Sequence, residues 1–231
     1  MSRHVRQESP LAAHKLEALA ADATLSGSTS VTFYERAFLG HINLRGDPRC
    51  SRFTSAAKRA LSCALPLDAN TYTEGEDIRA CWLGPDEWLI LCDGEHERAR
   101  AEALRDALQG ELAAVTEVGS GQTVVGVSGA RARDVVAKGC PLDLHPRVFG
   151  PGRCAQSYLA RAGMTILQIT AAPAFELIVR RSFADYVWRW LTDAAAEYGC
   201  AVIEAPPWRS ANAPVLRLAS ANQTPLPLST S

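Results

Sequence analysis

The chain has 231 residues, and its 24 Lys and Arg nearly balance its 25 Asp and Glu, giving a formal net charge of -1. A chain of this length forms one large domain or two small ones and holds a core without a metal or a disulfide. Hydrophobic residues make up 47% and charged residues 21%, which excludes wholesale disorder. The balanced charge gives no general attraction for nucleic acid or for an anionic membrane surface.

Cysteine use and hydropathy indicate the compartment. The seven cysteines form no C-x-x-C pair and mostly lie among apolar neighbours, as reduced and buried thiols do. No stretch approaches the ~20 uninterrupted apolar residues that a membrane span needs, and no apolar signal core follows the first residues. We therefore expect a cytoplasmic protein that contacts neither membrane nor nucleic acid.

Composition divides the chain into three regions. Residues 1–30 are an Ala/Ser/Thr-rich arm with a short amphipathic piece at 11–19, and residues 31–203 alternate between strand and helix periodicity. Residues 204–231 hold Pro206-Pro207 and later prolines in a Ser/Asn/Thr-rich setting, which argues against a packed core element. The sequence predicts an N-terminal arm, a single compact domain, and an extended tail that adds nothing to the core and either lies across another protein or is a disordered terminus.

In the first half of the domain, residues 31–44 predict one strand. Thr54 is expected to cap a helix that Pro66 stops. Two apolar runs within 78–92 flank Gly84-Pro85-Asp86-Glu87 and predict a hairpin. A helix is expected to follow at 96–109.

The second half repeats this alternation. Residues 113–127 predict two strands of a hairpin about Gly119-Ser120-Gly121, after which Ser128 caps a short helix. Further strands are expected near 154–160, 164–170 and 175–180. The last helix is predicted to begin with a capping box of Ser182 and Asp185.

These elements define the expected fold class. Short strands joined mostly by hairpins, with helices between groups of them, predict an α/β protein of the α+β kind. We expect a mainly antiparallel sheet with helices packed on one face, built from two βαβ-like halves.

The sequence shows none of the familiar catalytic motifs. It has no dinucleotide-binding turn, no phosphate loop and no nucleophile elbow. Cys140, His145 and Cys154 match no zinc spacing, and Asp86-Glu87 are adjacent in a turn and do not converge on one substrate. We predict no catalytic, cofactor-binding or metal-binding residue in this chain, which indicates a subunit or a binding module.

Several segments resemble a known family. They are Asn43–Asp47, Trp82–Leu89, Ser128–Arg131, Lys138–Pro146, Phe149–Gln156, Phe175–Leu177 and Arg180–Tyr186. In these segments the chain resembles the gamma subunit family of heterotetrameric sarcosine oxidase, over about residues 30–200. The middle segments carry most of the likeness, because a run of that length with the same order of Gly, Pro, Asp and His rarely arises by chance.

This resemblance implies a role in an alpha-beta-gamma-delta complex. In the family, the complex oxidatively demethylates sarcosine to glycine, releases hydrogen peroxide and forms 5,10-methylenetetrahydrofolate with tetrahydrofolate as cosubstrate. FAD, FMN and NAD belong to alpha and beta, and zinc belongs to delta, so no cofactor is expected in this chain. The family implies a non-catalytic subunit that docks on alpha, with a fold similar to the folate-binding part of the glycine-cleavage aminomethyltransferase.

An alternative is a free-standing folate-binding protein of the aminomethyltransferase-like family. Lys138-Gly139-Cys140 also begins the signature of folate-dependent proteins that maintain iron–sulfur enzymes. In those proteins an aromatic residue and Gly-Gln-Glu follow, whereas here Pro141-Leu142-Asp143-Leu144 follows.

The candidate partner interface centres on the loop from Cys140 to Cys154. Its prolines and glycines restrict the backbone, so we expect a structured loop that includes part of the surface facing alpha. Arg147 and Arg153 can make bidentate contacts to carboxylates of a partner. Gln156 and Trp208 complete the predicted interface set.

Overall fold

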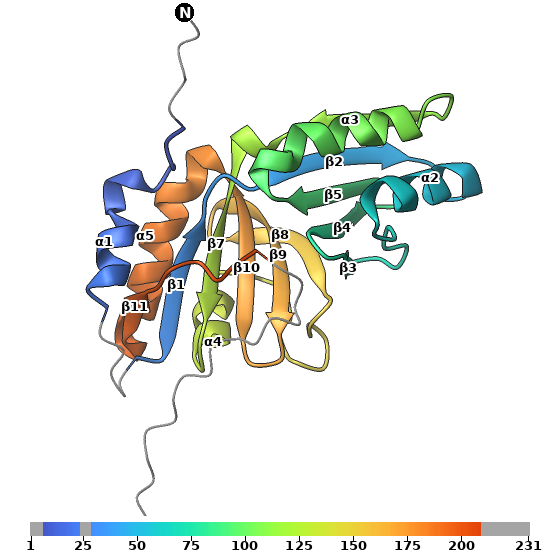
Figure 1. The fold of residues 1–231 in the computed structure, drawn as a ribbon. Helices are drawn as coiled ribbons and strands as arrows, with labels where there is room; N and C mark the ends of the chain where they lie inside the picture. The colour runs from blue at the N-terminus through green and yellow to red at the C-terminus, as the bar shows by residue number, and fades with distance from the viewer. Residues whose placement is uncertain (1–6, 24–28, 209–231) are drawn as a thin grey trace, which may run out of the picture.

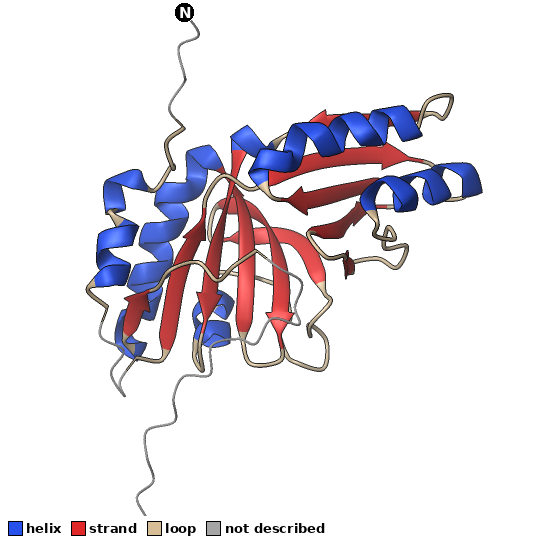
Figure 2. Ribbon diagram, in the orientation of Figure 1, coloured by secondary structure: helices blue, strands red, loops and turns tan. Residues whose placement is uncertain are grey.

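The computed structural model of the chain describes residues 7–23 and 29–208. In this part the strands form two sheets (Figures 1 and 2). Sheet A runs in the order β11 (Cys200–Val202), β1 (Val31–Arg36), β7 (Gln122–Ser128), β10 (Ala174–Arg180), β9 (Ala162–Thr170), β8 (Cys154–Leu159). Sheet B runs in the order β3 (Tyr72–Glu74), β4 (Ile78–Gly84), β5 (Glu87–Cys92), β2 (Gly40–Gly46), β6 (Ala113–Glu117). The β1–β11 pair is parallel, and the other pairs are antiparallel.

Helices accompany each sheet, as Figure 1 shows. With sheet A lie α1 (Leu16–Ala21), α4 (Ala132–Ala137) and α5 (Ala184–Ala195). With sheet B lie α2 (Ser51–Leu61) and α3 (Glu97–Ala107). Short 3₁₀ turns are η1 (Ala12–His14), η2 (Gly94–His96), η3 (Gly119–Gly121), η4 (Arg181–Phe183) and η5 (Ala196–Tyr198). None of the helices in the described ranges is long and apolar enough to cross a membrane.

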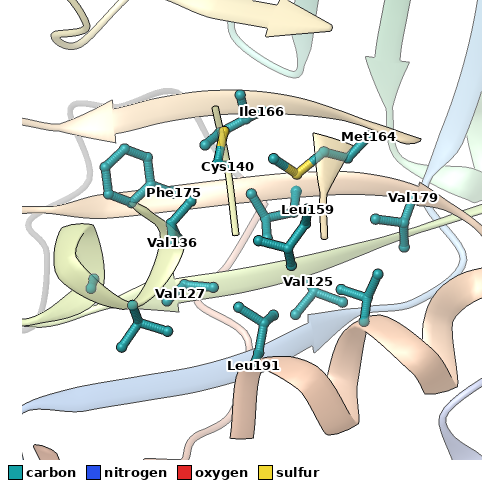
Figure 3. Packing of buried hydrophobic residues seen from close by; sticks show 14 of the residues in the cluster. Val125, Val127, Val136, Cys140, Leu159, Met164, Ile166, Phe175, Val179 and Leu191 are labelled. Carbon is teal, nitrogen blue, oxygen red and sulfur yellow. The ribbon is translucent and has the colours of Figure 1, made fainter. Parts of the chain in front are cut away.

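Three apolar clusters hold these layers together. Helix core A joins sheet A to α4 and α5, and Figure 3 shows Val125, Val127 and Phe175 packed there with Leu191. Helix core B joins sheet B to α2 and α3. The third cluster lies between the two sheets, and we call it the seam. The seam consists of Leu39, Tyr72, Cys81, Leu89, Leu91, Val124, Cys154, Leu167 and Ile178.

The predicted fold class is confirmed: the protein mixes antiparallel sheets with helices. The strands nevertheless divide between two sheets where we expected one. The reason is visible in β5, where Trp88 and Ile90 face helix core B while Leu89 and Leu91 face the seam. A strand that is apolar on both faces must be covered on both faces, which requires a second layer.

The single strand predicted at 31–44 is wrong. The chain forms β1 in sheet A and β2 in sheet B, and it turns between them at Phe38, whose φ is 60°. Alternating apolar residues on both sides of this turn give one continuous strand-like pattern. Hydrophobic periodicity therefore could not reveal the change of sheet.

The hairpin predicted at 113–127 is wrong for the same reason. β6 pairs with β2 in sheet B, whereas β7 pairs with β1 and β10 in sheet A. Gly119-Ser120-Gly121 forms the 3₁₀ turn η3 that carries the chain from one sheet to the other. Both crossovers meet at Glu97, whose Oε1 accepts hydrogen bonds from His41 N at 3.1 Å and Gly119 N at 2.9 Å.

The helices lie where the sequence predicts them, but their caps differ. α2 begins at Ser51, so Thr54 lies inside the helix. Ser128 ends β7, and its hydroxyl lies 2.7 Å from Thr32 Oγ1 instead of capping α4. Asp185 forms no capping box but pairs with His14 at 2.7 Å and with Arg189 at 3.0 Å. The Thr54 hydroxyl donates to Cys50 O at 3.4 Å, one helical turn earlier, whereas Ser128 and Asp185 have tertiary partners.

The domain boundaries at residues 31 and 203 stay a prediction. Leu11 of the predicted arm is fully buried in helix core A, and Trp208 of the predicted tail packs against the seam. The first residues of the tail therefore contribute to the chain's own packing, contrary to the expectation that the tail adds nothing to the core. The rest of the predicted tail, 209–231, lies outside the described residues.

Candidate functional site

The loop between α4 and β8 is structured, as predicted. Leu144 and Phe149 are buried in helix core A. The carbonyl of His145 accepts hydrogen bonds from Val148 N at 2.8 Å and from Phe149 N at 2.9 Å. The two buried side chains and the two backbone hydrogen bonds fix the loop, so its exposed side chains project from a defined backbone.

Exposed arginines of this region lack a carboxylate partner among the described residues. Arg147 and Arg153 are exposed, and within the described residues neither pairs with a carboxylate. Arg161, in the turn after β8, is also exposed and also has no carboxylate partner there. Arg49 and Arg98 are equally exposed but pair within the chain, with Asp47 at 2.9 Å and Glu102 at 3.0 Å. The charge near β8 is thus available to another molecule.

Large apolar side chains are exposed in the same region. Tyr158 of β8 is 61% exposed, and Val148, next to Arg147, is 54% exposed. Leu67 is 61% exposed and lies two residues before Ala69, whose carbonyl is 3.5 Å from Arg153 Nη1. We call this set the β8 surface. It consists of Leu67, Arg147, Val148, Arg153, Gln156, Tyr158 and Arg161.

The β8 surface follows the edge of sheet A. β8 pairs with β9 on one side and ends the strand order of the sheet on the other. Gln156, a predicted interface residue, is exposed on β8, and its Nε2 donates to Leu83 O at 2.9 Å. This bond ties β8 to β4, so Gln156 also joins sheet A to sheet B.

Trp208, the fourth predicted interface residue, lies elsewhere. Its indole Nε1 donates to Asp77 O at 3.2 Å, just before β4, whereas Gln156 contacts Leu83 near the other end of that strand. The structure therefore places Arg153 and Gln156 along β8, leaves Arg147 exposed in the loop that leads into β8, and places Trp208 at the seam. Contact of any of these residues with a partner stays a prediction.

A second surface, at the far end of sheet B, lacks free charge. It is a groove lined by Arg45, Asp47, Pro48, Arg49, Pro85, Asp86 and Leu112. Its charged groups pair with one another, Arg45 with Asp86 at 3.4 Å and Arg49 with Asp47 at 2.9 Å. This groove offers a partner less charge than the β8 surface does.

A buried ionic cluster joins the two sheets beside the seam. Glu176 of β10 accepts from Arg36 of β1 at 3.0 Å and from Arg79 of β4 at 2.6 Å. The hydroxyl of Tyr34 donates to the same carboxylate at 3.1 Å, and Arg79 also pairs with Glu74 at 2.7 Å. Both oxygens of Glu176 are therefore occupied by protein donors.

Electrostatics keep this cluster ionised. Burial raises the pKa of Glu176, but Arg79 and Arg36 more than offset burial, so the pKa lies below its ordinary value. Burial and the neighbouring carboxylate raise the pKa of Tyr34 far above its ordinary value. A carboxylate with both oxygens bonded and a depressed pKa is poorly suited to act as a general base, so the cluster is a structural clamp.

The sequence carries a signal for this cluster in two of its strands. Arg79 stands between Ile78 and Ala80, and Glu176 stands between Phe175 and Leu177. A single charge inside an apolar strand indicates a buried ion that needs a partner. The pairing itself could not be predicted, because the two residues are far apart in the sequence and lie in different sheets.

The candidate metal residues do not converge. Cys140 Sγ lies 3.8 Å from Ser157 Oγ, His145 Nδ1 accepts from Arg147 N, and Cys154 Sγ lies 3.1 Å from Thr71 O. Across residues 7–23 and 29–208, no three metal-ligating side chains come together. All seven cysteines lie in these ranges as free thiols.

Comparison with solved structures defines the class of fold. The glycine cleavage system aminomethyltransferase T from Bartonella henselae superposes with a TM-score of 0.57 at 14% identity. The match covers 84% of this chain and 51% of that chain. The chain therefore has an aminomethyltransferase-like fold.

Relatives define the family. A model of the sarcosine oxidase gamma subunit family matches residues 45–197. The sarcosine oxidase gamma subunit of Corynebacterium sp. (strain U-96) is 32% identical over 195 residues, covering 83% of this chain and 92% of that protein. The gamma subunit of Corynebacterium sp. (strain P-1) is 33% identical over 181 residues, covering 77% of this chain and 87% of that protein.

The solved structures agree with the relatives. A chain of the heterotetrameric sarcosine oxidase from Corynebacterium sp. U-96, in complex with pyrrole 2-carboxylate, superposes with a TM-score of 0.74 at 31% identity. The match covers 84% of this chain and 97% of that chain. This chain belongs to the sarcosine oxidase gamma subunit family, which confirms the resemblance found in the sequence.

Proposed function

We propose that this chain is the gamma subunit of a cytoplasmic heterotetrameric sarcosine oxidase and serves as an assembly subunit that docks on alpha. The complex oxidatively demethylates sarcosine to glycine, releases hydrogen peroxide and forms 5,10-methylenetetrahydrofolate. The observation that supports docking is the β8 surface, where unpaired arginines stand beside exposed apolar side chains. Family membership supports the complex.

The β8 surface has the chemistry of a protein interface. Guanidinium groups bind carboxylates through two parallel hydrogen bonds, which gives orientation as well as energy. Aromatic and arginine side chains are enriched at interface cores, and Tyr158 and Val148 would lose their exposed area to a partner. We place complementary carboxylates on alpha, facing Arg147 and Arg153.

The proposal assigns the cofactors to other subunits. FAD, FMN and NAD belong to alpha and beta, zinc to delta, and tetrahydrofolate enters as cosubstrate. In support, both oxygens of Glu176, the buried carboxylate beside the seam, already bind protein donors. We predict that this chain purified alone is colourless and does not oxidise sarcosine. A stoichiometric flavin on the isolated, folded chain would contradict this prediction.

Assembly tests the docking surface directly. The chain is coexpressed with its genomic neighbours, carrying Arg147→Ala and Arg153→Ala together, and the copurifying proteins and their absorbance spectrum are measured. The matched control carries Arg49→Ala and Arg98→Ala, which remove two exposed arginines that already pair within the chain. We expect the first pair to reduce copurification of the flavin-containing subunit after a salt wash and the control to leave it unchanged.

Wild-type copurification by the Arg147/Arg153 variant would show that the β8 surface does not bind alpha. Failure of the wild-type chain to capture any flavoprotein would count against the whole proposal. In that case the alternative of a free-standing folate-binding protein predicts that the isolated chain binds tetrahydrofolate by calorimetry. The aminomethyltransferase likeness at 14% identity supports the fold alone and does not favour that alternative.

A further inference from the structure

Sheet B is an insertion in sheet A. The chain leaves sheet A after β1, builds all of sheet B between residues 40 and 117, and returns at β7. The two crossovers lie side by side, because Val118 N donates to His41 O at 2.7 Å and both crossovers bond to Glu97. Both crossovers enter sheet B through β2 and β6, on one side of its strand order, so the opposite edge, formed by β3 and β4, is held to sheet A by non-covalent contacts.

The segment 203–208 supplies such a contact. Figure 1 shows the chain after β11 running across the strands of sheet A. Its backbone is held by β1, since Ile203 N donates to Phe33 O at 2.8 Å and Arg36 Nη1 donates to Pro206 O at 2.5 Å. Trp208 at its end donates from the indole to Asp77 O, which belongs to the sheet B insertion. The segment therefore spans the two sheets.

The indole occupies a defined position. Its ring lies 5.5 Å from the guanidinium carbon of Arg36, from sheet A, and 5.0 Å from that of Arg79, from sheet B. Both cations are buried and both pair with Glu176, and Arg79 pairs with Glu74 as well. Two desolvated guanidinium groups with their charge already paired favour a planar aromatic face, and the carbonyl of Asp77 favours a ring that carries an N–H.

We propose that residues 203–208 form a strap that latches sheet B onto sheet A, and that Trp208 closes the latch by filling a site selective for a planar aromatic ring with an N–H donor. Opening the latch loosens the β3–β4 edge of sheet B, which the crossovers do not hold. The seam then opens while helix cores A and B stay closed, because neither core contains a strap residue.

Native cysteines report on each core separately. Cys81 and Cys154 are fully buried at the seam, Cys92 is buried in helix core B, and Cys140 is buried in helix core A. A thiol reagent labels a buried cysteine only when its surroundings open, so the labelling rate measures local opening. The rates at the four sites are measured on the full-length chain by mass spectrometry of tryptic peptides.

We expect Trp208→Ala to speed labelling of Cys81 and Cys154 by about tenfold or more, as loss of desolvated cation–π contacts predicts. Cys92 and Cys140 should keep their wild-type rates. The control is Tyr198→Ala, which removes a ring stacked on Arg131 at 5.6 Å and Lys138 at 4.6 Å, away from the seam. It should leave the labelling of both seam cysteines unchanged.

Two further measurements test the ring site. Free indole, added to Trp208→Ala, should slow labelling of the seam cysteines again, whereas cyclohexanol should not. Trp208→Phe should protect the seam better than Trp208→Leu, because leucine keeps apolar volume but has no ring. Equal acceleration at all four cysteines, or wild-type rates in Trp208→Ala, would overturn the latch; equal protection by leucine and phenylalanine without indole rescue would overturn the ring site.

Discussion

The two faces of β10 differ in how they hold the protein together. On one face Phe175, Leu177 and Val179 pack into helix core A. On the other, Glu176 pairs with arginines from both sheets while Ile178 packs in the seam. One strand thus supports an apolar layer and an ionic layer, separated by the alternation of its side chains.

The two layers are expected to differ in how well they tolerate substitution. An apolar layer accepts any side chain of similar volume, because burial depends on area and packing and not on a named partner. The ionic layer accepts few changes, because removing one member leaves a buried charge without compensation. Glu176, Arg36 and Arg79 therefore set how the two sheets meet, whereas helix core A supplies burial.

Two substitutions that preserve shape test whether the ionic layer is less tolerant than the apolar layer. Glu176→Gln removes one charge, and we expect it to lower the free energy of unfolding by about 3 kcal/mol or more, because two buried arginines lose their shared counterion. Leu177→Met preserves apolar volume and should cost less than about 1.5 kcal/mol. Urea denaturation of the full-length variants measures both. Equal costs would mean that the ionic layer is as tolerant as the apolar one.

A triple variant tests whether the cost of Glu176→Gln comes from leaving buried charges unpaired. Replacing Glu176, Arg36 and Arg79 together by apolar residues of similar size should recover much of the stability lost in Glu176→Gln, because no buried arginine is then left without its counterion. Glu74, which loses Arg79, is partly exposed to solvent. If the triple variant is less stable than Glu176→Gln, the polar contacts of these arginines matter more than their charge balance.

A smaller effect concerns His41, which alternates with Ile42 on β2 and so faces away from helix core B. Neither ring nitrogen has a partner, and burial lowers the pKa of His41 to about 4. The unfolded chain binds this proton below pH about 6.5 while the folded chain does not, so stability falls as pH falls from there towards 4. The total is about 3 kcal/mol.

We expect His41→Leu to remove that part of the pH dependence. Glu176 acts in the same direction, because its depressed pKa contributes stability that is lost as the carboxylate protonates at lower pH. The measurement is the free energy of unfolding of wild type and variant between pH 4 and 7. Parallel curves would show that His41 does not titrate on unfolding in this range.

The smallest effect is expected for an exposed ion pair. Arg98 and Glu102 pair at 3.0 Å on the surface of α3 and form the exposed counterpart of Arg79 and Glu176. Water and salt screen such a pair, so Glu102→Gln should shift the urea midpoint too little to measure. A shift as large as that of Glu176→Gln would show that burial is not what distinguishes the two pairs.

The sequence predicted those elements that depend on local signals. The hairpin of β4 and β5 was predicted because apolar runs flank a turn with proline, and the structure pairs Trp82 with Trp88 across it. The family was predicted from runs such as Lys138–Pro146, which preserve residue order over many positions. Arg147 and Arg153 were placed together because they share one loop, and both are exposed in the structure.

The errors concern contacts between distant segments. The crossovers at Phe38 and Gly119 were taken for a continuous strand and a hairpin, because periodicity records which residues are apolar and not which sheet they join. The contact of Trp208 with a partner stays a prediction. What the sequence did not reveal is that its ring packs on Arg36 and Arg79 of its own chain, which are far from it in the sequence.

The sequence by itself therefore determined the fold class, the family and the position of most helices and strands, since these follow from local periodicity, turn residues and the order of residues within motifs. Only the tertiary structure decided that the strands form two sheets, that Glu176 holds Arg36 and Arg79 across them, and that the segment 203–208 covers the seam. The physical reason is that a buried charge or ring gains its partner from the packing of segments far apart in the chain, and no local pattern names that partner.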